Sequence, residues 1–184
     1  MEFPEETGLL FKAYRFAAGK HRNQRRKDTL ESPYINHPIE VALVLWEVGG
    51  VRDADVLLAA ILHDTIEDTN THESEIKEAF GQGVLEYVLE VTDDKSLPKK
   101  VRKKLQIEHA PKKSHGAKLI SLADKSSNLR NLNTIPPKDW DHARRAEYLL
   151  WTEQVVAGLR GTNAALEWYY DQQLAAGKTL LGID

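Results

Sequence analysis

An apolar stretch from Val56 to Leu62 runs directly into His63 and Asp64, and this junction constrains the fold more than any other feature. A helix from Val56 to about Ile66 would be apolar almost all round, so we expect it at the centre of the molecule. Its end then places ionisable side chains in a medium of low dielectric constant, where a charge is costly unless it is paired or bound to a metal. The sequence therefore predicts a divalent metal ion at the end of a central helix.

Helical periodicity continues through the rest of the chain. We expect further helices at about residues 9–18, 39–48, 73–80, 84–91, 99–109, 117–132, 139–151 and 152–174. Asp53 or Asp55 can cap the central helix, and Asn36-His37-Pro38 is typical of a helix start with proline at the first helical position. We find no alternation of strand length, so the predicted fold is all-α, with residues 1–184 forming a single domain.

Composition narrows the class of protein. Of the 184 residues, 41% are hydrophobic and 29% are charged, which is ordinary for a soluble protein, and no apolar run is long enough for a membrane span. The acidic N-terminus is unlike a secretory signal, and the absence of cysteine is compatible with a reducing cytoplasm, so we expect a cytoplasmic protein without a membrane partner. The net charge of −3 argues against nucleic-acid binding, although residues 20–27 and 95–104 are locally basic.

Two tiers of ionisable side chains are expected along the end of the central helix. His63 and Asp64 can lean toward one pocket, and Glu67 and Asp68 stand one helical turn further on. An imidazole and a carboxylate suit metal ligation, whereas the second pair is close enough to contact water beside the metal.

Two distant residues can complete the first tier, and each has a simpler alternative. His37 and Asp124 both lie within otherwise apolar helical patterns. His37 could belong only to a helix start, Asp124 could form a surface salt bridge with Lys125 or Arg130, and residues 67–70 could be a solvated helix end.

Three motifs resemble those of one known family. Residues 34–42 (YINHPIEVA), 63–69 (HDTIEDT) and 122–130 (LADKSSNLR) are similar to the signatures of the hydrolase domain in the RelA/SpoT family of HD-domain phosphohydrolases. The resemblance covers roughly residues 9–168 and is strongest to the stand-alone small alarmone hydrolases, including their metazoan branch. It implies an HD-domain helical bundle that acts in the stringent response. The implied activity is that of a guanosine-3′,5′-bis(diphosphate) 3′-pyrophosphohydrolase, which converts (p)ppGpp to GDP or GTP plus pyrophosphate.

The resemblance also implies roles for individual residues. It implies four ligands for one metal ion, usually Mn²⁺ in this family: His37, His63, Asp64 and Asp124. Mixed nitrogen and oxygen donors would also accept Fe²⁺, Co²⁺ or Zn²⁺. Glu67 and Asp68 match the catalytic acids that orient or deprotonate the attacking water.

Five residues are expected to bind the nucleotide substrate: Arg26, Lys27, Lys99, Asn128 and Tyr148. A substrate with two diphosphates needs guanidinium and ammonium groups that converge on phosphate oxygens, which gives the two basic segments a use. Arg26, Lys27 and Asn128 do not discriminate ppGpp or pppGpp from NADPH. Removal of the 2′-phosphate of NADPH is therefore an alternative activity, and a catalytically silent nucleotide-binding module is a second alternative.

Overall fold

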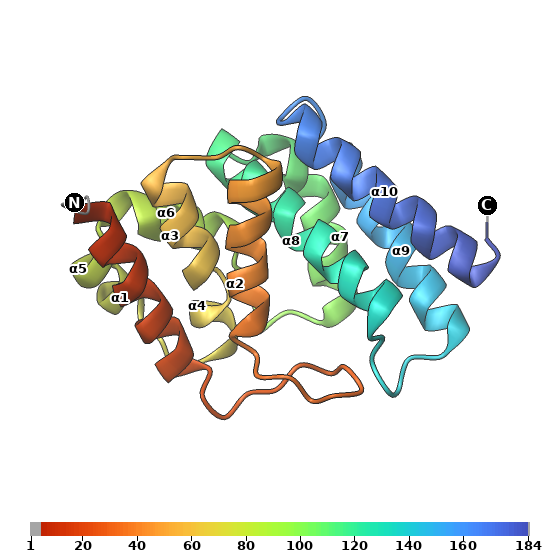
Figure 1. The fold of residues 1–184 in the computed structure, drawn as a ribbon, viewed down its shortest axis with the longest axis horizontal. Coiled ribbons are helices and arrows are strands. Elements are labelled where there is room, and N and C mark those ends of the chain that lie inside the picture. Colours follow the sequence, from red (N-terminus) through yellow and green to blue (C-terminus); the bar gives the residue numbers. More distant parts are fainter. Residues whose placement is uncertain (1–4, 184) are drawn as a thin grey trace.

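The computed structural model describes residues 5–183 and is built from helices (Figure 1). The elements are α1 (Glu5–Lys20), α2 (Asn36–Leu43), η1 (Val44–Val48), α3 (Ala54–Leu62), α4 (Thr65–Asp68), α5 (Glu73–Phe80), α6 (Gln82–Val91), α7 (Lys99–His109), η2 (Ala110–Lys112), α8 (His115–Thr134), α9 (His142–Ala157) and α10 (Ala164–Leu181). Segment η1 is a π turn that continues α2, and η2 is a 3₁₀ turn after α7. Residues 5–183 contain no strand, only two isolated β-bridges, so the predicted all-α fold is confirmed.

Helix α3 lies at the centre of the fold, as its apolar composition predicts. All residues from Val56 to Leu62 are buried, and the helix contacts α1, α2, α6 and α8. Asp53 caps its start by accepting a hydrogen bond from the backbone N–H of Val56 at 3.2 Å. His63 and Asp64 directly follow α3, so their side chains lie toward the interior.

Helix α8 is the second structural centre, and it brings a distant part of the chain to the end of α3. It contacts α2, α3 and α6 as well as α9 and α10, and Figure 1 shows α10 running alongside α8. Asp124 lies midway along α8, and His37 lies in the first turn of α2. The packing of α2, α3 and α8 is what places these two residues beside His63.

The central helix ends earlier than predicted. The sequence predicts a helix to about Ile66, but α3 ends at Leu62 and a two-residue turn precedes α4. Side chains satisfy the carbonyls of the last turn here, because His63 Nδ1 bonds Ala60 O at 2.7 Å and Thr65 Oγ1 donates to Leu62 O at 2.6 Å. The predicted continuous helix is wrong at this point: His63 and Asp64 lie in the turn after α3, whereas Glu67 and Asp68 lie on α4.

Two other boundaries also differ from the prediction. Helix α2 begins at Asn36, so Pro38 is its third residue, where a missing N–H is still harmless. The predicted division between residues 151 and 152 is wrong, because α9 continues to Ala157 and Asn163 caps α10. The connection needs Gly158 for close packing, since a Cβ there would lie 2.8 Å from Pro111 Cδ.

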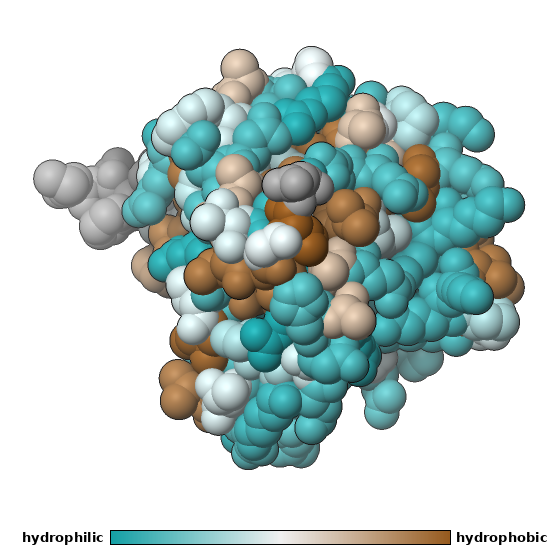
Figure 2. Space-filling model, turned by 90° about the vertical axis from the view of Figure 1, so that its right-hand side faces the viewer, coloured by the Kyte–Doolittle hydropathy of each residue, from teal (hydrophilic) through white to brown (hydrophobic). Residues whose placement is uncertain are grey.

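The surface at the C-terminal end of the molecule is mostly hydrophilic. Figure 2 views this end and shows mostly teal residues, with a smaller area of brown near the centre. Among residues 5–183, none of the helices combines the length and the apolar composition that crossing a membrane requires.

The central position of α3 leads to a stability prediction. Leu58 is 1% exposed, so Leu58→Ala should lower the free energy of unfolding by about 2–5 kcal/mol, through lost burial and the cavity that remains. Leu180→Ala is the matched control, because Leu180 is 66% exposed and its truncation should change stability by less than about 0.5 kcal/mol. Urea denaturation measures both, and equal effects would contradict the central placement of α3.

Candidate active site

Three side chains, from α2, from the turn after α3 and from α8, form a group that can hold a metal ion. His37, His63 and Asp124 each offer one ligand atom, and these atoms all lie within 4.8 Å of one another. Asp124 Oδ1 is 3.0 Å from His37 Nε2 and 4.0 Å from His63 Nε2. Both histidines are buried, so water competes little for the donor atoms. The structure thus brings three of the four predicted ligands close enough together to bind one metal ion.

The hydrogen bonds of His63 leave one ring nitrogen free for a cation. His63 Nδ1 lies 2.7 Å from Ala60 O, and a carbonyl only accepts, so Nδ1 carries a proton. The other nitrogen, Nε2, is buried and has no hydrogen-bond partner of acceptable geometry, although Asp64 Oδ2 lies 3.1 Å away. An imidazole held through Nδ1 with a free Nε2 has the arrangement of a metal-binding histidine, so the residues fit a metal.

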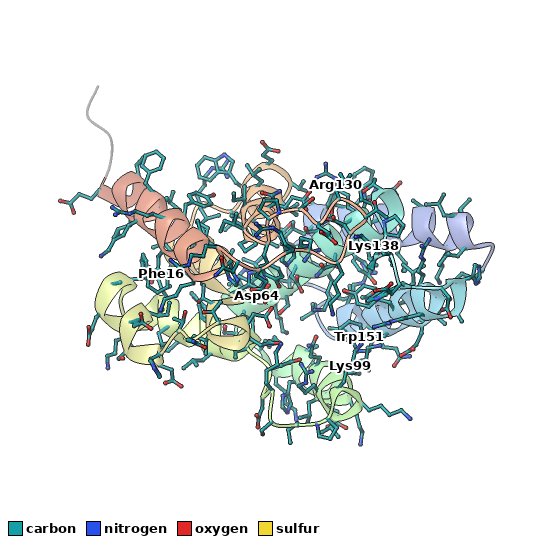
Figure 3. All side chains as sticks on the ribbon, turned by 90° about the horizontal axis from the view of Figure 1, so that it is seen from below. Phe16, Asp64, Lys99, Arg130, Lys138 and Trp151 are labelled. Carbon is teal, nitrogen blue, oxygen red and sulfur yellow. The ribbon has the colours of Figure 1, made fainter. Side chains whose placement is uncertain are left out.

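Asp64, the fourth predicted ligand, lies beside the two histidines but outside the group of three. Its Oδ2 is 3.1 Å from His63 Nε2 and 3.8 Å from His37 Nε2, and it accepts a hydrogen bond from Tyr34 Oη at 2.6 Å. In Figure 3 Asp64 lies near the middle of the molecule. The structure therefore places all four predicted ligands at one locus.

Opposite charges stabilise the ionised carboxylates in this buried cluster. Burial raises the pKa of Asp64, but the nearby imidazoles of His63 and His37 together outweigh it and hold the pKa well below its usual range. Burial lowers the pKa of His63, and the carboxylate of Asp64 more than reverses this, to about 9. In the metal-free protein a proton on His63 therefore supplies the positive charge that the carboxylates need.

A buried lysine completes the charge balance on α8. Lys125 Nζ lies 2.8 Å from Asp124 Oδ2, so the salt bridge that the sequence offered as an alternative does form, but in the interior rather than on the surface. Asp124 Oδ1 meanwhile accepts a hydrogen bond from Asn128 Nδ2 at 2.6 Å and faces His37. The two oxygens of Asp124 thus have separate partners, and both the salt bridge and the ligand geometry are present together.

Glu67 lies on α4 beside this cluster, next to a backbone N–H donor and two cationic side chains. Its Oε2 accepts a hydrogen bond from the backbone N–H of Asp93 at 2.9 Å, and its Oε1 lies 3.2 Å from Lys95 Nζ and 3.7 Å from an Arg102 nitrogen. Burial nevertheless raises the pKa of Glu67 above its ordinary value. A carboxylate with a raised pKa is a better proton acceptor than one exposed to solvent.

Asp68 is held at both carboxylate oxygens. Lys95 Nζ lies 2.5 Å from Oδ1, and Gln24 Nε2 donates to Oδ2 at 3.2 Å. Lys95 belongs to the turn before α7 and Gln24 to the loop after α1, so two segments far apart in the sequence meet at Asp68. Both predicted catalytic acids therefore line the same cavity as the predicted metal ligands.

The predicted substrate-binding residues surround three adjoining cavities. The first, of about 400 Å³, contains the metal ligands, the acid pair, Arg26 and Asn128. A second, of about 370 Å³, shares Arg26 and Asn128 with the first and adds Lys27 and Tyr148. A third, of about 260 Å³, shares Tyr148 with the second and adds Lys99. Figure 3 shows Lys99 and Trp151 on the α7 and α9 side of Asp64.

The predicted substrate-binding residues differ in how closely they are connected to the metal ligands. Arg26 donates to Asn128 Oδ1 at 2.9 Å, and Asn128 donates in turn to Asp124, so this chain of hydrogen bonds links the cavity wall to the metal group. Burial raises the pKa of Tyr148 to about 12, so its phenol stays protonated. Lys27 is exposed at the rim of the second cavity.

Sequence reasoning missed four residues that contact the site: Gln24, Tyr34, Lys95 and Arg102. It named Lys125 only as a surface partner of Asp124. Some signal was present, because Lys95 and Arg102 belong to a recognised basic segment and Tyr34 to a recognised motif. Periodicity shows which face of a helix a residue occupies, but it does not show which loop side chain reaches across to a carboxylate.

The buried salt bridge between Lys125 and Asp124 leads to a second prediction. Lys125→Met keeps the length of the side chain but leaves the Asp124 carboxylate uncompensated. The free energy of unfolding, measured with urea in the presence of a chelator, should fall by about 3–5 kcal/mol.

The matched control for this variant is Lys104→Met. Lys104 forms an exposed pair with Glu108 one turn along α7, at 3.3 Å, and its loss should cost less than about 1 kcal/mol. Equal losses in the two variants would show that Lys125 has no special role in charge compensation.

Comparisons with known proteins agree with this geometry. The family model of the HD domain matches residues 13–155. The guanosine-3′,5′-bis(diphosphate) 3′-pyrophosphohydrolase MESH1 of Xenopus tropicalis is 54% identical over 166 residues, which cover 90% of this chain and 93% of that protein. The human protein of the same name is 55% identical over 162 residues, covering 88% and 90%.

A solved structure has the same fold over nearly the whole chain. It is described as a metazoan ortholog of SpoT that hydrolyses ppGpp, and it matches with a TM-score of 0.91 and 46% sequence identity, covering 95% of this chain and 97% of its own. The chain therefore belongs to the HD-domain family and, within it, to the SpoT-related MESH1 proteins.

Proposed function

We propose that this chain is a metal-dependent hydrolase that removes the 3′-diphosphate of guanosine tetraphosphate or pentaphosphate. Water is consumed, the bond between the ribose 3′-oxygen and phosphorus breaks, and GDP or GTP leaves with pyrophosphate. One observation carries the proposal: a single cavity is lined by the candidate metal ligands, by the carboxylates of Glu67 and Asp68 next to them, and by basic side chains. High identity to proteins named for this reaction supports the substrate.

Four residues would hold the metal, which we propose to be one Mn²⁺ ion: His37, His63, Asp64 and Asp124. The two imidazole nitrogens and two carboxylates form a mixed donor set that suits Mn²⁺ and would also accept other divalent transition metals. When bound, the ion lowers the pKa of water and neutralises negative charge at the phosphoryl group. Lys125 and Asn128 keep the Asp124 carboxylate oriented for this task.

Glu67 and Asp68 would act on the attacking water. Glu67 suits the role of proton acceptor, because burial raises the pKa of its carboxyl group. Asp68, the next residue along the chain, would orient the same water molecule. Lys95 and Arg102 lie close to these carboxylates and limit their mutual repulsion.

Basic and polar side chains around the adjoining cavities would bind the nucleotide. Arg26 and Asn128 are placed to contact phosphate or ribose next to the metal group, and Lys27 lies at the rim. Lys99 and Tyr148 would contact the part of the substrate that extends into the third cavity. A guanidinium and two ammonium groups supply positive charge for a substrate with two diphosphates.

We further propose that the chain forms one hydrolase domain that works in the cytoplasm. One cluster of buried apolar residues includes members of α1, α3, α8 and α10, which supports a single domain. The sequence contains no cysteine, so the fold needs no oxidising compartment.

The proposed substrate is tested by side-by-side kinetics with guanosine tetraphosphate and NADPH. We expect Mn²⁺-dependent release of pyrophosphate from the first, loss of turnover on chelation, and recovery when Mn²⁺ is restored. A higher kcat/KM for phosphate release from NADPH would make the 2′-phosphatase activity the principal one. Binding of guanosine tetraphosphate without pyrophosphate release would indicate a catalytically silent module.

The division of labour between the two tiers is tested by a pair of variants. Asp64→Ala should lose bound Mn²⁺ and turnover together, because it removes a ligand and its charge. Glu67→Gln should keep Mn²⁺ but lose about 100-fold or more in kcat, because the amide keeps the shape and cannot accept a proton. Metal content by elemental analysis and pyrophosphate release are the measurements. Normal turnover in Glu67→Gln would contradict the role of Glu67.

A further inference from the structure

We propose that Gln24, held in place by His21, is a positioning residue for the Asp68 carboxylate. Gln24 lies on the wall of the second cavity and would act through the Asp68 carboxylate, by setting the direction in which it faces the attacking water. This inference rests on the proposed function, in which Asp68 orients that water.

Two hydrogen bonds link the three side chains in a row. Gln24 Nε2 lies 3.2 Å from Asp68 Oδ2, and Gln24 Oε1 lies 2.7 Å from His21 Nδ1. An ionised carboxylate only accepts hydrogen bonds, so the NH₂ group of the Gln24 amide must face Asp68. The amide oxygen then faces His21, and His21 Nδ1 must donate to it. The donor and acceptor properties of these groups therefore determine both the orientation of the Gln24 amide and the presence of a proton on His21 Nδ1.

His21 is a firm support for this row because the surrounding residues restrict its ring. The side chain is 2% exposed, and its ring stacks on that of Tyr34 with centroids 4.8 Å apart and an interplanar angle of 28°. Tyr34 in turn donates its hydroxyl to Asp64 Oδ2 at 2.6 Å. One small group of side chains thus touches an acid of each tier, and it can set the distance between them.

The backbone also restrains Gln24. Its N–H donates to His21 O at 2.9 Å, and its carbonyl accepts from the N–H of Tyr34 at 3.2 Å. The loop after α1 is therefore tied back on itself at the residue that contacts Asp68. Little rearrangement is needed for the amide to hold its position when the substrate binds.

The partner on the other side of Asp68 is of a different kind. Lys95 contacts Oδ1 at 2.5 Å, but its side chain is 48% exposed, and it also contacts Glu67 at 3.2 Å. A long, half-exposed ammonium group shared between two acids neutralises charge but specifies direction poorly. Gln24 is consequently the contact that fixes the angle of the Asp68 carboxylate.

The first test replaces Gln24 with methionine, which has a similar length and makes neither hydrogen bond. With guanosine tetraphosphate and Mn²⁺, kcat for Gln24→Met should fall about 10–100-fold, as for other residues that orient a catalytic group. Mn²⁺ content should stay close to that of the wild type, because no metal ligand changes, and kcat should fall by a larger factor than KM rises, because the effect acts through Asp68. The matched control is Gln82→Met, which removes a surface amide that donates to Glu86 at 3.0 Å and should leave kcat unchanged.

The second test uses the nitrogen of His21 that must donate. His21→Asn places an amide N–H near the position of Nδ1 and should keep most of the wild-type kcat. In His21→Leu, kcat should fall to the value measured for Gln24→Met. The double variant His21→Leu/Gln24→Met should be no slower than Gln24→Met alone, because both changes break the same row.

Asp68→Asn separates failure of this inference from failure of the proposed function. If Asp68→Asn loses turnover while Gln24→Met and His21→Leu keep the wild-type kcat, Asp68 acts on the water but Gln24 does not position it. If Asp68→Asn keeps full turnover, the proposed role of Asp68 is itself wrong. A fall in kcat that is matched by loss of Mn²⁺, or by equal slowing in His21→Asn and His21→Leu, would show a general structural role and overturn the positioning role.

Discussion

The need to compensate two mostly buried carboxylates organises this structure. The side chains of Asp64 and Asp124 are 17% and 15% exposed, and an uncompensated negative charge there would be costly. His63 supplies charge next to Asp64, and Lys125 supplies it next to Asp124. With these partners in place, Nε2 of both His37 and His63, Oδ2 of Asp64 and Oδ1 of Asp124 face one point. A divalent cation at that point would take over the compensating role that the proton on His63 has in the metal-free protein.

The break between α3 and α4 separates the tasks of neighbouring residues. His63 follows directly after the buried helix, whereas Glu67 and Asp68 lie on a short helix that faces the cavity and meets the turn before α7. The outer acids are stabilised by partly exposed cations, chiefly Lys95, and the inner ones by the buried side chains of His63 and Lys125. This difference suits an inner tier that must not move and an outer tier that must exchange protons with water.

Agreement between sequence and structure is best where a single strong pattern dominates. Helix α7 matches its prediction, because Pro98 and Pro111 bound a clear amphipathic run. Disagreement arises where side chains or packing compete with helix propensity. The end of α3 breaks because His63 and Thr65 bond its carbonyls, and the connection after α9 depends on a close approach to Pro111 that no local pattern records.

The sequence by itself determined the all-α class, the central apolar helix, and the identity of the residues that gather at its end. It could do so because helical periodicity is local and three motifs occur in order along the chain. Only the tertiary structure decided how those residues are held: Lys125 buried against Asp124, and Lys95 and Gln24 on opposite oxygens of Asp68. The contacts of Lys95 and Gln24 join loops to α4 across 27 and 44 residues, and the burial of Lys125 depends on the helices packed around α8, so no local pattern in the chain encodes this geometry.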